Sequence, residues 1–441
     1  MITAKKINLL LVLFLISVIT FAQHSSLETF LNEQAQIKSV EKLETTDFFT
    51  EKFKVMVEQA LDHEHPEKGT FLQRVIICNK GIDRPVVFIT EGYNGGYAEN
   101  PRYINELSPI LEANQICMDH RYFGESTPEP LNWKYLTVKN AAADHHTVIQ
   151  MMKKYYSGKW ITTGISKGGQ TVVYHRWLYP DDVDVSIPYV APLNFDIEDG
   201  RHEPFIANTT GTPDGRRKVR DFQLYIFKHR DEFVPMLKKF CDEKHLHPRL
   251  NPEEMLDYVV LEYSYGFWQY GTPIEDIPAL DAGNQILFDH LVKVSSPMYL
   301  SDEGVGIFLS FYIQAAKELG YYGYDTKPFK EYLHIKSAKG WLNKIYIPKD
   351  AKIKYSPKTA RQVEKFINTT DARILFIYGE WDPWSASAFE VPYKDNFLKI
   401  VKPEGSHSAR INNLPENQKK QVKTKLEEWL GIPVNIKMED E

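Results

Sequence analysis

The segment WITTGISKGGQTVVYH, residues 160–175, restricts the fold more than any other part of the sequence. Residues 160–163 favour a β-strand, whereas residues 170–179 contain no helix breaker. Between them lies GISKG (residues 164–168), which matches the pattern G-x-S-x-G. A strand that turns sharply into a helix exposes the serine hydroxyl, and the flanking glycines leave room for neighbouring backbone. The segment therefore predicts that Ser166 is a nucleophile.

Short β-favouring runs alternate with helical patterns on both sides of this segment. The predicted strands are residues 71–78, 85–90, 114–120, 159–166, 183–191, 372–380 and 397–403. Helices are predicted over about residues 140–156 and 170–179, and a last helix begins near Pro415 with Gly431 just past its end. This alternation favours a mostly parallel sheet covered by helices.

Residues 196–355 have a different pattern, in which long stretches mix charged and apolar residues with helical spacing. Such stretches are typical of amphipathic helices. We therefore predict a sheet domain in two parts, residues 23–195 and 356–441, that is interrupted by a helical cap over residues 196–355.

The first 22 residues have the order of a secretory signal peptide. Lys5 and Lys6 precede an apolar run over residues 7–21, and Ala22 follows. The run is short for a membrane span. We expect an exported protein, periplasmic or secreted, without stable membrane insertion after signal cleavage. The net charge of −6 gives no electrostatic reason to expect a nucleic-acid partner.

The cysteines and histidines indicate neither a disulfide framework nor a metal site. Cys78, Cys117 and Cys241 allow one disulfide at most, and the ordinary interpretation is buried free thiols. Histidines occur in pairs at residues 63 and 65, 145 and 146, and 245 and 247, and these pairs lack an H-E-x-x-H arrangement or cysteine partners. We expect no metal and no organic cofactor.

A nucleophilic serine needs a histidine to take its proton and a carboxylate to orient that histidine. On a sheet of this kind the three residues follow the chain order Ser, Asp, His. Asp382 follows the predicted strand 372–380, and His407 follows the predicted strand 397–403. Taken singly, Asp382 could be a turn residue and His407 a loop residue. Their order and context together predict a triad of Ser166, Asp382 and His407.

The tetrahedral intermediate of acyl transfer needs two N–H donors. One donor should be the backbone N–H of Lys167, directly after the nucleophile, rather than the charge of its side chain. The other should come from the loop EGYNGG after the strand 85–90, where Gly92 and Tyr93 are the candidates. The alternative for this loop is a simple glycine-rich turn.

Three blocks of the sequence carry a resemblance to a known family. They are TGISKGGQTVVYHRWLYPDDVDVSIPYVAP, FIYGEWDPWSA and EGSHSARI, and they resemble the secreted bacterial prolyl tri- and tetrapeptidyl aminopeptidases, a family of serine peptidases. HRYFGES (residues 120–126) and DPWS (residues 382–385) are also similar to segments of the prolyl carboxypeptidase and dipeptidyl peptidase family. The resemblance implies an α/β-hydrolase fold with a helical cap. It also implies Ser166 as nucleophile, Asp382 as orienting acid and His407 as general base.

The activity that the resemblance implies is cleavage of peptides after proline, with release of short N-terminal fragments, tri- or tetrapeptides. In the related carboxypeptidases the tryptophan of DPWS lines the pocket for proline, so Trp384 is the corresponding residue, and a flat aromatic face suits the proline ring. Glu91 is the candidate partner for the substrate ammonium, although the related G-N-E-G motif is absent here. Trp384 could instead be a core residue, and Glu91 could cap its loop.

Other functions remain open at this point. A dipeptidyl peptidase or a prolyl carboxypeptidase-like enzyme would use the same triad, and so would an esterase or lipase, because fold and triad do not choose between ester and amide. A non-catalytic surface binding protein would not need the triad. We expect proline-containing peptides as substrates.

Overall fold

One nine-stranded sheet organises the chain, of which the computed structural model describes residues 25–438. The order across the sheet is β1-β2-β3-β5-β4-β6-β7-β8-β9. The strands are β1 (Ile37–Leu43), β2 (Glu51–Ala60), β3 (Thr70–Asn79), β4 (Val86–Thr90), β5 (Asn114–Met118), β6 (Trp160–Ile165), β7 (Val185–Tyr189), β8 (Arg373–Gly379) and β9 (Phe397–Lys402). Pairing is antiparallel from β1 to β5 and parallel from β5 to β9. The predicted signal peptide lies outside the described residues.

The parallel strands β4 to β8 are buried on both faces, as their nearly continuous apolar sequences require. In β4, Val87 and Ile89 belong to one core cluster, whereas Val86 and Phe88 belong to another on the opposite face. Residues of helices α2 (Leu107–Leu111) and α13 (Glu416–Leu430) complete the first cluster, and residues of α3 (Val138–Met152) complete the second. The central parallel strands are therefore held between two layers of helices.

The three helices predicted for the sheet domain lie close to their predicted positions. Helix α3 begins at Val138 because the Thr137 hydroxyl caps it by accepting from the backbone N–H of Asn140. Helix α13 ends at Leu430, and Gly431 follows with a positive φ of 67°. Helix α4 (Lys167–Leu178) begins at Lys167 rather than near residue 170, and helices α2 and α12 (Lys358–Thr369) were not predicted.

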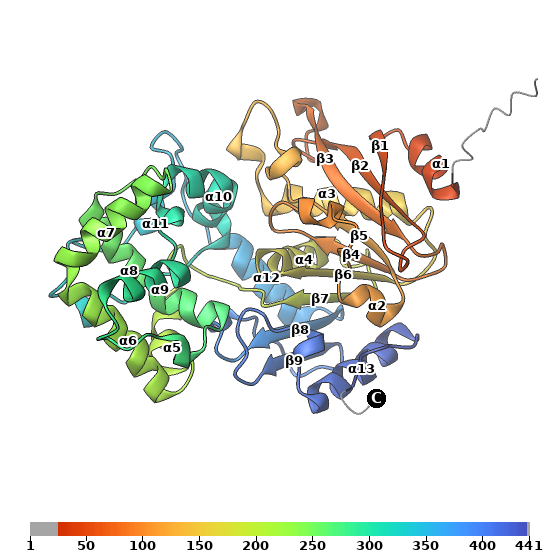
Figure 1. Ribbon diagram of the computed structural model, residues 1–441. Coiled ribbons are helices and arrows are strands. Elements are labelled where there is room, and N and C mark those ends of the chain that lie inside the picture. Colours follow the sequence, from red (N-terminus) through yellow and green to blue (C-terminus); the bar gives the residue numbers. More distant parts are fainter. Residues whose placement is uncertain (1–24, 439–441) are drawn as a thin grey trace, which may run out of the picture.

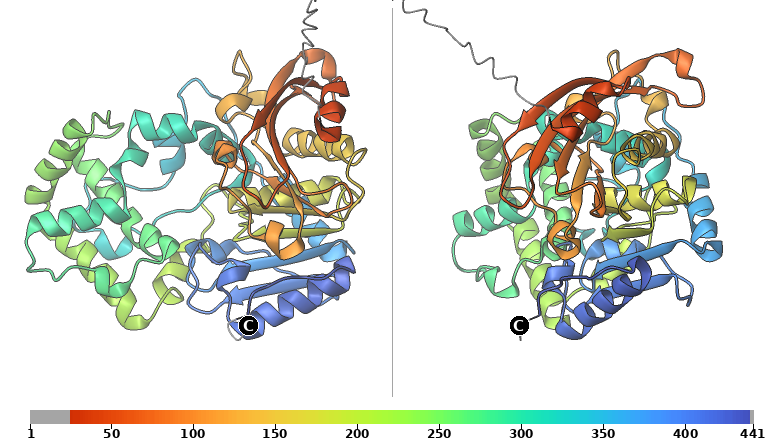
Figure 2. Two further views of the ribbon diagram at one scale, coloured as in Figure 1. Left: turned by 45° about the vertical axis from the view of Figure 1, so that its right-hand side comes forward. Right: turned by 90° about the vertical axis from the view of Figure 1, so that its right-hand side faces the viewer.

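The chain between β7 and α12 is helical and gathers to one side of the sheet (Figure 1). Its helices are α5 (His202–Asn208), α6 (Pro213–Lys228), α7 (Arg230–Glu243), α8 (Pro252–Tyr270), α9 (Asn284–Val294), α10 (Asp302–Gln314) and α11 (Trp341–Ile345). We call residues 202–345 the helical insertion. It has its own aromatic-rich core, and that core includes Trp384 from the loop after β8. The left view of Figure 2 shows the insertion beside the sheet.

The first elements of the chain are missing from the sequence-based prediction, which placed no strand before residue 71. They are α1 (Ser26–Glu33), β1 and β2. Strand β1 is an edge strand with no buried residue, so its sequence carries little apolar signal. Strand β2 does carry a signal, because Phe53, Val55 and Val57 alternate with less buried residues.

The sheet has the topology of an α/β-hydrolase, as the sequence predicted: a mostly parallel sheet with a serine at a sharp strand-to-helix turn. Parallel strands bring their carboxyl ends to one edge, where ligands bind in open α/β sheets. The loops after β4, β6, β8 and β9 all leave from this edge. Cys78, Cys117 and Cys241 are free and buried. None of the helices within residues 25–438 is both long and apolar enough to cross a membrane.

Candidate active site

Ser166 occupies a strained backbone conformation between β6 and α4. Its φ of 58° and ψ of −122° lie outside the regions that side chains favour. Two backbone hydrogen bonds hold it there: its N–H donates to the carbonyl of Tyr189 at 2.9 Å, and the N–H of Gln170 donates to its carbonyl at 2.9 Å. Strain maintained by the surrounding structure is typical of a nucleophile held out of the helix that follows it.

The glycines of the GISKG motif allow the backbones around Ser166 to approach closely. A Cβ atom on Gly164 would lie 2.5 Å from the carbonyl carbon of Gly168, and one on Gly168 would lie 2.8 Å from the carbonyl oxygen of Thr90. Such distances are shorter than carbon and oxygen atoms tolerate without backbone movement. The glycines are therefore required by close packing of β6, α4 and β4.

Gly164→Ala is expected to lower the free energy of unfolding by about 1–3 kcal/mol, the usual cost of overpacking a tightly packed core. Urea unfolding measures the change. Gly200→Ala is the matched control, because a Cβ at Gly200 meets no atom within 4 Å. Equal unfolding free energies for the two variants would contradict the packing argument.

Asp382 and His407 form a hydrogen-bonded pair at the carboxyl edge of the sheet. The Nδ1 atom of His407 lies 2.7 Å from Oδ2 of Asp382, and Asp382 has no exposed surface. The other carboxylate oxygen, Oδ1, accepts from the backbone N–H of Trp384 at 3.1 Å. With Nδ1 donating to the carboxylate, the lone pair of the ring is on Nε2, which is the tautomer that a general base requires.

The loop that carries His407 is attached to the helical insertion. The backbone N–H of His407 donates to the carbonyl of Gln269, in α8, at 3.0 Å. On its other side the guanidinium of Arg410 donates to the carbonyl of His407 at 3.1 Å. The histidine is thus positioned by both parts of the molecule.

The loop after β4 packs against the beginning of α4. A Cβ on Gly92 would lie 2.6 Å from the backbone nitrogen of Gly168, so the two backbones nearly touch. Lys167 is the first residue of α4, where N–H groups are not used by the helix itself. These contacts bring both predicted sources of oxyanion donors, Lys167 and the Gly92-Tyr93 segment, beside Ser166.

The Lys167 side chain makes a contact that the sequence did not reveal. Its Nζ atom donates to the carbonyl of Gly92 at 2.6 Å, and it lies over the rings of Tyr93 and Phe123, 5.6 and 5.3 Å from their centroids. Burial lowers the pKa of the Lys167 amine well below its usual range, against the attraction of Glu318 and Glu91. The side chain therefore joins the turn at Ser166 to the loop after β4.

A cavity of about 300 Å³ lies between the sheet edge and the helical insertion. Ser166, His407, Tyr93 and Trp384 all line it. Much of the remaining wall is aromatic and comes from the helical insertion and from Tyr346 just after it. The tyrosines from these parts include Tyr258, Tyr312, Tyr321, Tyr322, Tyr324 and Tyr346. The cavity can hold an apolar group next to a serine hydroxyl and a histidine.

Trp384 lies in a cage of aromatic rings. Its ring centroid is 5.5 Å from each of His202, Tyr265 and Tyr322, and 5.6 Å from Tyr321. Only 8% of its surface is exposed. Trp384 therefore belongs to the core of the insertion and lines the cavity as well, so the two interpretations of this residue are compatible.

Glu91, the predicted partner for a substrate ammonium, faces a different set of groups. Its carboxylate accepts from the hydroxyl of Tyr97 and from the backbone N–H of Gly92. Burial raises the pKa of Glu91 to about 7, and the nearby charge of Asp119 adds to this shift. The described residues that line the cavity do not include Glu91, so its predicted role stays a prediction.

Glu262 is on α8 and lines the cavity, and it is not among the site residues predicted from the sequence. Its carboxylate accepts hydrogen bonds from the hydroxyls of Tyr322 and Tyr324. Burial raises the pKa of Glu262 to about 7, although the two tyrosine hydrogen bonds act in the opposite direction. The sequence shows only an acidic residue within an amphipathic helix, which is ordinarily an exposed one.

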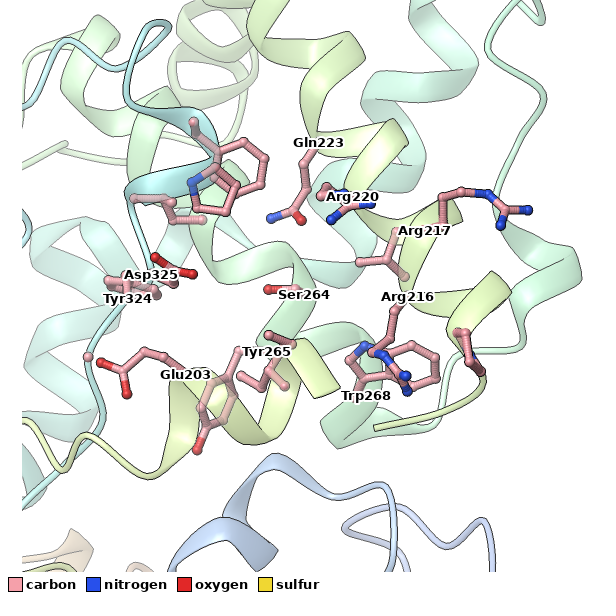
Figure 3. A pocket seen from close by; sticks show the side chains of 18 residues that line it. Glu203, Arg216, Arg217, Arg220, Gln223, Ser264, Tyr265, Trp268, Tyr324 and Asp325 are labelled. Atoms are coloured by element: carbon pink, nitrogen blue, oxygen red, sulfur yellow. The ribbon is translucent and has the colours of Figure 1, made fainter. Parts of the chain in front are cut away.

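A second cavity, of about 240 Å³, lies inside the insertion, and Tyr324 lines both cavities. Figure 3 shows Arg216, Arg217 and Arg220 along one side and Glu203 and Asp325 on the other. Its lining includes neither Ser166 nor His407. Within residues 25–438, no cluster of three or more His, Cys, Asp or Glu side chains is placed to hold a metal ion.

Comparison with known proteins finds a family match over nearly the whole chain. The sequence model of the family described as PS-10 peptidase S37 matches residues 33–440. The prolyl tri/tetrapeptidyl aminopeptidase of Streptomyces mobaraensis is 30% identical over 395 residues, which cover 87% of this chain and 81% of that protein. The lysosomal Pro-X carboxypeptidase of Mus musculus is 28% identical over 153 residues, 31% of each chain.

Solved structures are more distant. The proline iminopeptidase of Mycobacterium smegmatis matches with a TM-score of 0.38 and 11% sequence identity, over 89% of this chain and 96% of that one. The peroxisomal α/β-hydrolase Lpx1 of Saccharomyces cerevisiae matches with a TM-score of 0.40 and 12% identity, over 88% and 92%.

Proposed function

This chain belongs to the PS-10 peptidase S37 family of serine peptidases, and from that premise we propose that it is an exopeptidase that cleaves after proline. It would release tri- or tetrapeptides from the amino terminus of its substrates, as the name of the Streptomyces mobaraensis relative describes for that protein. The observation that carries the proposal is the hydrogen-bonded pair of Asp382 and His407. His407 lines one cavity with Ser166 and Trp384.

The mechanism is acyl transfer in two steps. Nε2 of His407 takes the proton of the Ser166 hydroxyl as its oxygen attacks the carbonyl carbon after proline, and Asp382 stabilises the imidazolium. His407 then gives the proton to the leaving amine, which breaks the peptide bond and leaves the proline carbonyl esterified to Ser166. Water then attacks this ester while His407 takes its proton, and the bond to the Ser166 oxygen breaks as His407 gives that proton to it, which releases the acid and restores the serine.

The oxyanion of each tetrahedral intermediate would be bound by the N–H of Lys167 and by a second N–H from the Gly92-Tyr93 segment. The N–H of Gly92 bonds the carboxylate of Glu91, whereas Tyr93 lines the cavity beside Ser166. Tyr93 is therefore the better second donor. Two fixed donors in a site that excludes water stabilise the charge as it develops.

The proline ring would pack against Trp384. Trp384 is held at the cavity wall by the surrounding aromatic rings, and its backbone N–H is bonded to Asp382. A ring fixed in this way offers a flat apolar surface at a constant distance from the triad. Selection for proline and catalysis would then depend on the same short loop after β8.

Hydrolysis of chromogenic amides tests the proposal. Ala-Ala-Pro p-nitroanilide is expected to be cleaved, and Ala-Pro p-nitroanilide is expected to be cleaved more slowly. Short-chain p-nitrophenyl esters serve as the comparison for esterase activity. Mass spectrometry of fragments from one proline-containing peptide reports the bond, the direction and the fragment length together. Turnover of esters alone would favour an esterase, and fragments released from the carboxyl end would favour a carboxypeptidase.

Lys167→Met is expected to lower kcat by about tenfold, which is less than the hundredfold or more that follows loss of an oxyanion donor. Methionine keeps the apolar stem but leaves the carbonyl of Gly92 without its donor, so the loop loses a contact that fixes its position. The measurement is kcat on Ala-Ala-Pro p-nitroanilide, with the exposed Lys420→Met as control. An unchanged kcat would show that the backbone alone positions the loop.

Export remains part of the proposal. Residues 1–22 have the composition of a signal peptide. Amino-terminal sequencing of the protein from culture medium or periplasm is expected to begin near Gln23.

A further inference from the structure

Glu262 is the one carboxylate among the described residues that line the catalytic cavity, and neither lysine nor arginine lines it. The side chain is partly exposed, and that exposure is to the cavity. A carboxylate in such a place is costly unless a cation or strong donors accompany it. The wall supplies donors but neither lysine nor arginine, so the Glu262 carboxylate has no such partner in the cavity that Ser166 and His407 also line.

Two tyrosines fix the Glu262 carboxylate in position. The hydroxyl of Tyr322 lies 3.0 Å from Oε1 and 2.9 Å from Oε2, and the hydroxyl of Tyr324 donates to Oε2 at 2.6 Å. A carboxylate can accept about four hydrogen bonds. The Oε1 atom, which Tyr322 alone contacts among these donors, therefore keeps capacity for a ligand.

The surroundings of Glu262 favour a small cation. Burial raises the pKa of this carboxyl to about 7. The group therefore readily loses its proton and becomes negative when a positive group binds beside it. The faces of nearby tyrosines carry negative potential and attract ammonium groups. A bound ammonium would replace the water that Glu262 has lost.

We propose that Glu262 binds the amino-terminal ammonium of the peptide substrate. The inference rests on the proposed exopeptidase function and adds what that function lacks, a residue that measures from the amino terminus. Ser166 and Glu262 line the same cavity, so the chain that fits between them sets the length of the fragment released. Substrates whose amino terminus is blocked or too distant lose this contact.

Two other arrangements are distinguishable from this one. Glu91 would be the ammonium site if the sequence-based prediction holds, but its carboxylate is already bonded to Tyr97 and to the N–H of Gly92. Alternatively, Glu262 would act only as a neutral brace between α8 and the segment that holds Tyr322 and Tyr324. A brace would affect all substrates alike.

The experiment compares free and N-acetylated Ala-Ala-Pro p-nitroanilide. Glu262→Gln keeps the size and the hydrogen-bonding capacity of the side chain but removes its charge. On the free peptide, kcat/KM is expected to fall roughly a hundredfold, as when one partner of a buried charge pair is removed. On the acetylated peptide it is expected to stay within about twofold, since that substrate never makes the charged contact.

Glu203→Gln is the matched control, because Glu203 is a carboxylate of the insertion that lines the neighbouring cavity (Figure 3). It is expected to leave the preference for the free peptide unchanged. Glu91→Gln belongs in the same series, and a loss of preference in that variant alone would move the ammonium site to Glu91.

The possible results distinguish failure of the ammonium-binding role of Glu262 from failure of the proposed exopeptidase function. A wild-type protein that cleaves neither amide, or that cleaves both equally well, contradicts the exopeptidase function. A wild-type preference for the free peptide that persists in Glu262→Gln contradicts the inference alone. Fluorophosphonate labelling of Ser166 reports whether each variant folds. Should Glu262→Gln fail to fold, Glu262→Asp keeps the charge, and an equal loss on both peptides in that variant contradicts the inference.

Discussion

Ser166→Ala is expected to lower kcat by roughly 10⁶-fold, the size of effect that follows removal of a serine nucleophile from a triad. The methyl group of alanine cannot form the acyl-enzyme, and what rate remains comes from binding and from the oxyanion donors. The measurement is kcat on Ala-Ala-Pro p-nitroanilide together with labelling by a fluorophosphonate probe, which should disappear.

Ser157→Ala is the control, because Ser157 is an exposed serine just before β6, at the opposite end of the strand from Ser166. A double variant, Ser166→Ala with His407→Ala, should lose no more activity than Ser166→Ala alone, since residues of a triad act as a unit. Labelling that persists in Ser166→Ala would place the nucleophile elsewhere, and absence of labelling in the wild-type protein would favour a non-catalytic binding function.

Asp382→Asn is expected to lower kcat by about 10⁴-fold. The carboxylate accepts from Trp384 with one oxygen and from His407 with the other, whereas an asparagine has a single acceptor oxygen. If that oxygen keeps the N–H of Trp384, the amide NH₂ faces Nδ1 of His407. The ring then carries its proton on Nε2 and cannot accept one from Ser166.

The measurement for Asp382→Asn is again kcat, with thermal unfolding as a check that the variant folds. Asp395→Asn is the control, because Asp395 is an exposed aspartate just before β9. A loss no greater than that of the control would show that Asp382 does not orient His407. Full burial of Asp382 excludes water as a substitute for the lost acceptor.

The sequence predicted those features that depend on local pattern. The strand-turn-helix at Ser166 could be predicted because glycines in fixed positions have a steric cause, and the structure shows the close backbone contacts that they permit. Helix α13 and its glycine end are set by equally local rules. Ser166, Asp382 and His407 each follow a strand that can be recognised from its pattern of apolar residues. Their order along the chain could therefore be predicted as well.

Long-range contacts could not be predicted from the same patterns. Glu262 and Tyr322 are 60 positions apart in the chain and meet only when the insertion has folded. The contact of Lys167 with Gly92 spans 75 positions, and nothing near either residue signals it. Edge strand β1 was missed for another reason: without a buried face it lacks the alternation on which strand prediction depends.

The hydrogen bond between the N–H of His407 and the carbonyl of Gln269 has a consequence for engineering. Helix α8 carries Glu262 and also holds the backbone of His407 through Gln269. An insertion taken from a relative would therefore replace the contact that holds His407. Substrate preference and turnover would therefore change together in chimaeras exchanged between β7 and α12. Single substitutions of the tyrosines that line the cavity do not remove that hydrogen bond. They are therefore the better way to change the length of the released fragment while the catalytic residues stay in position.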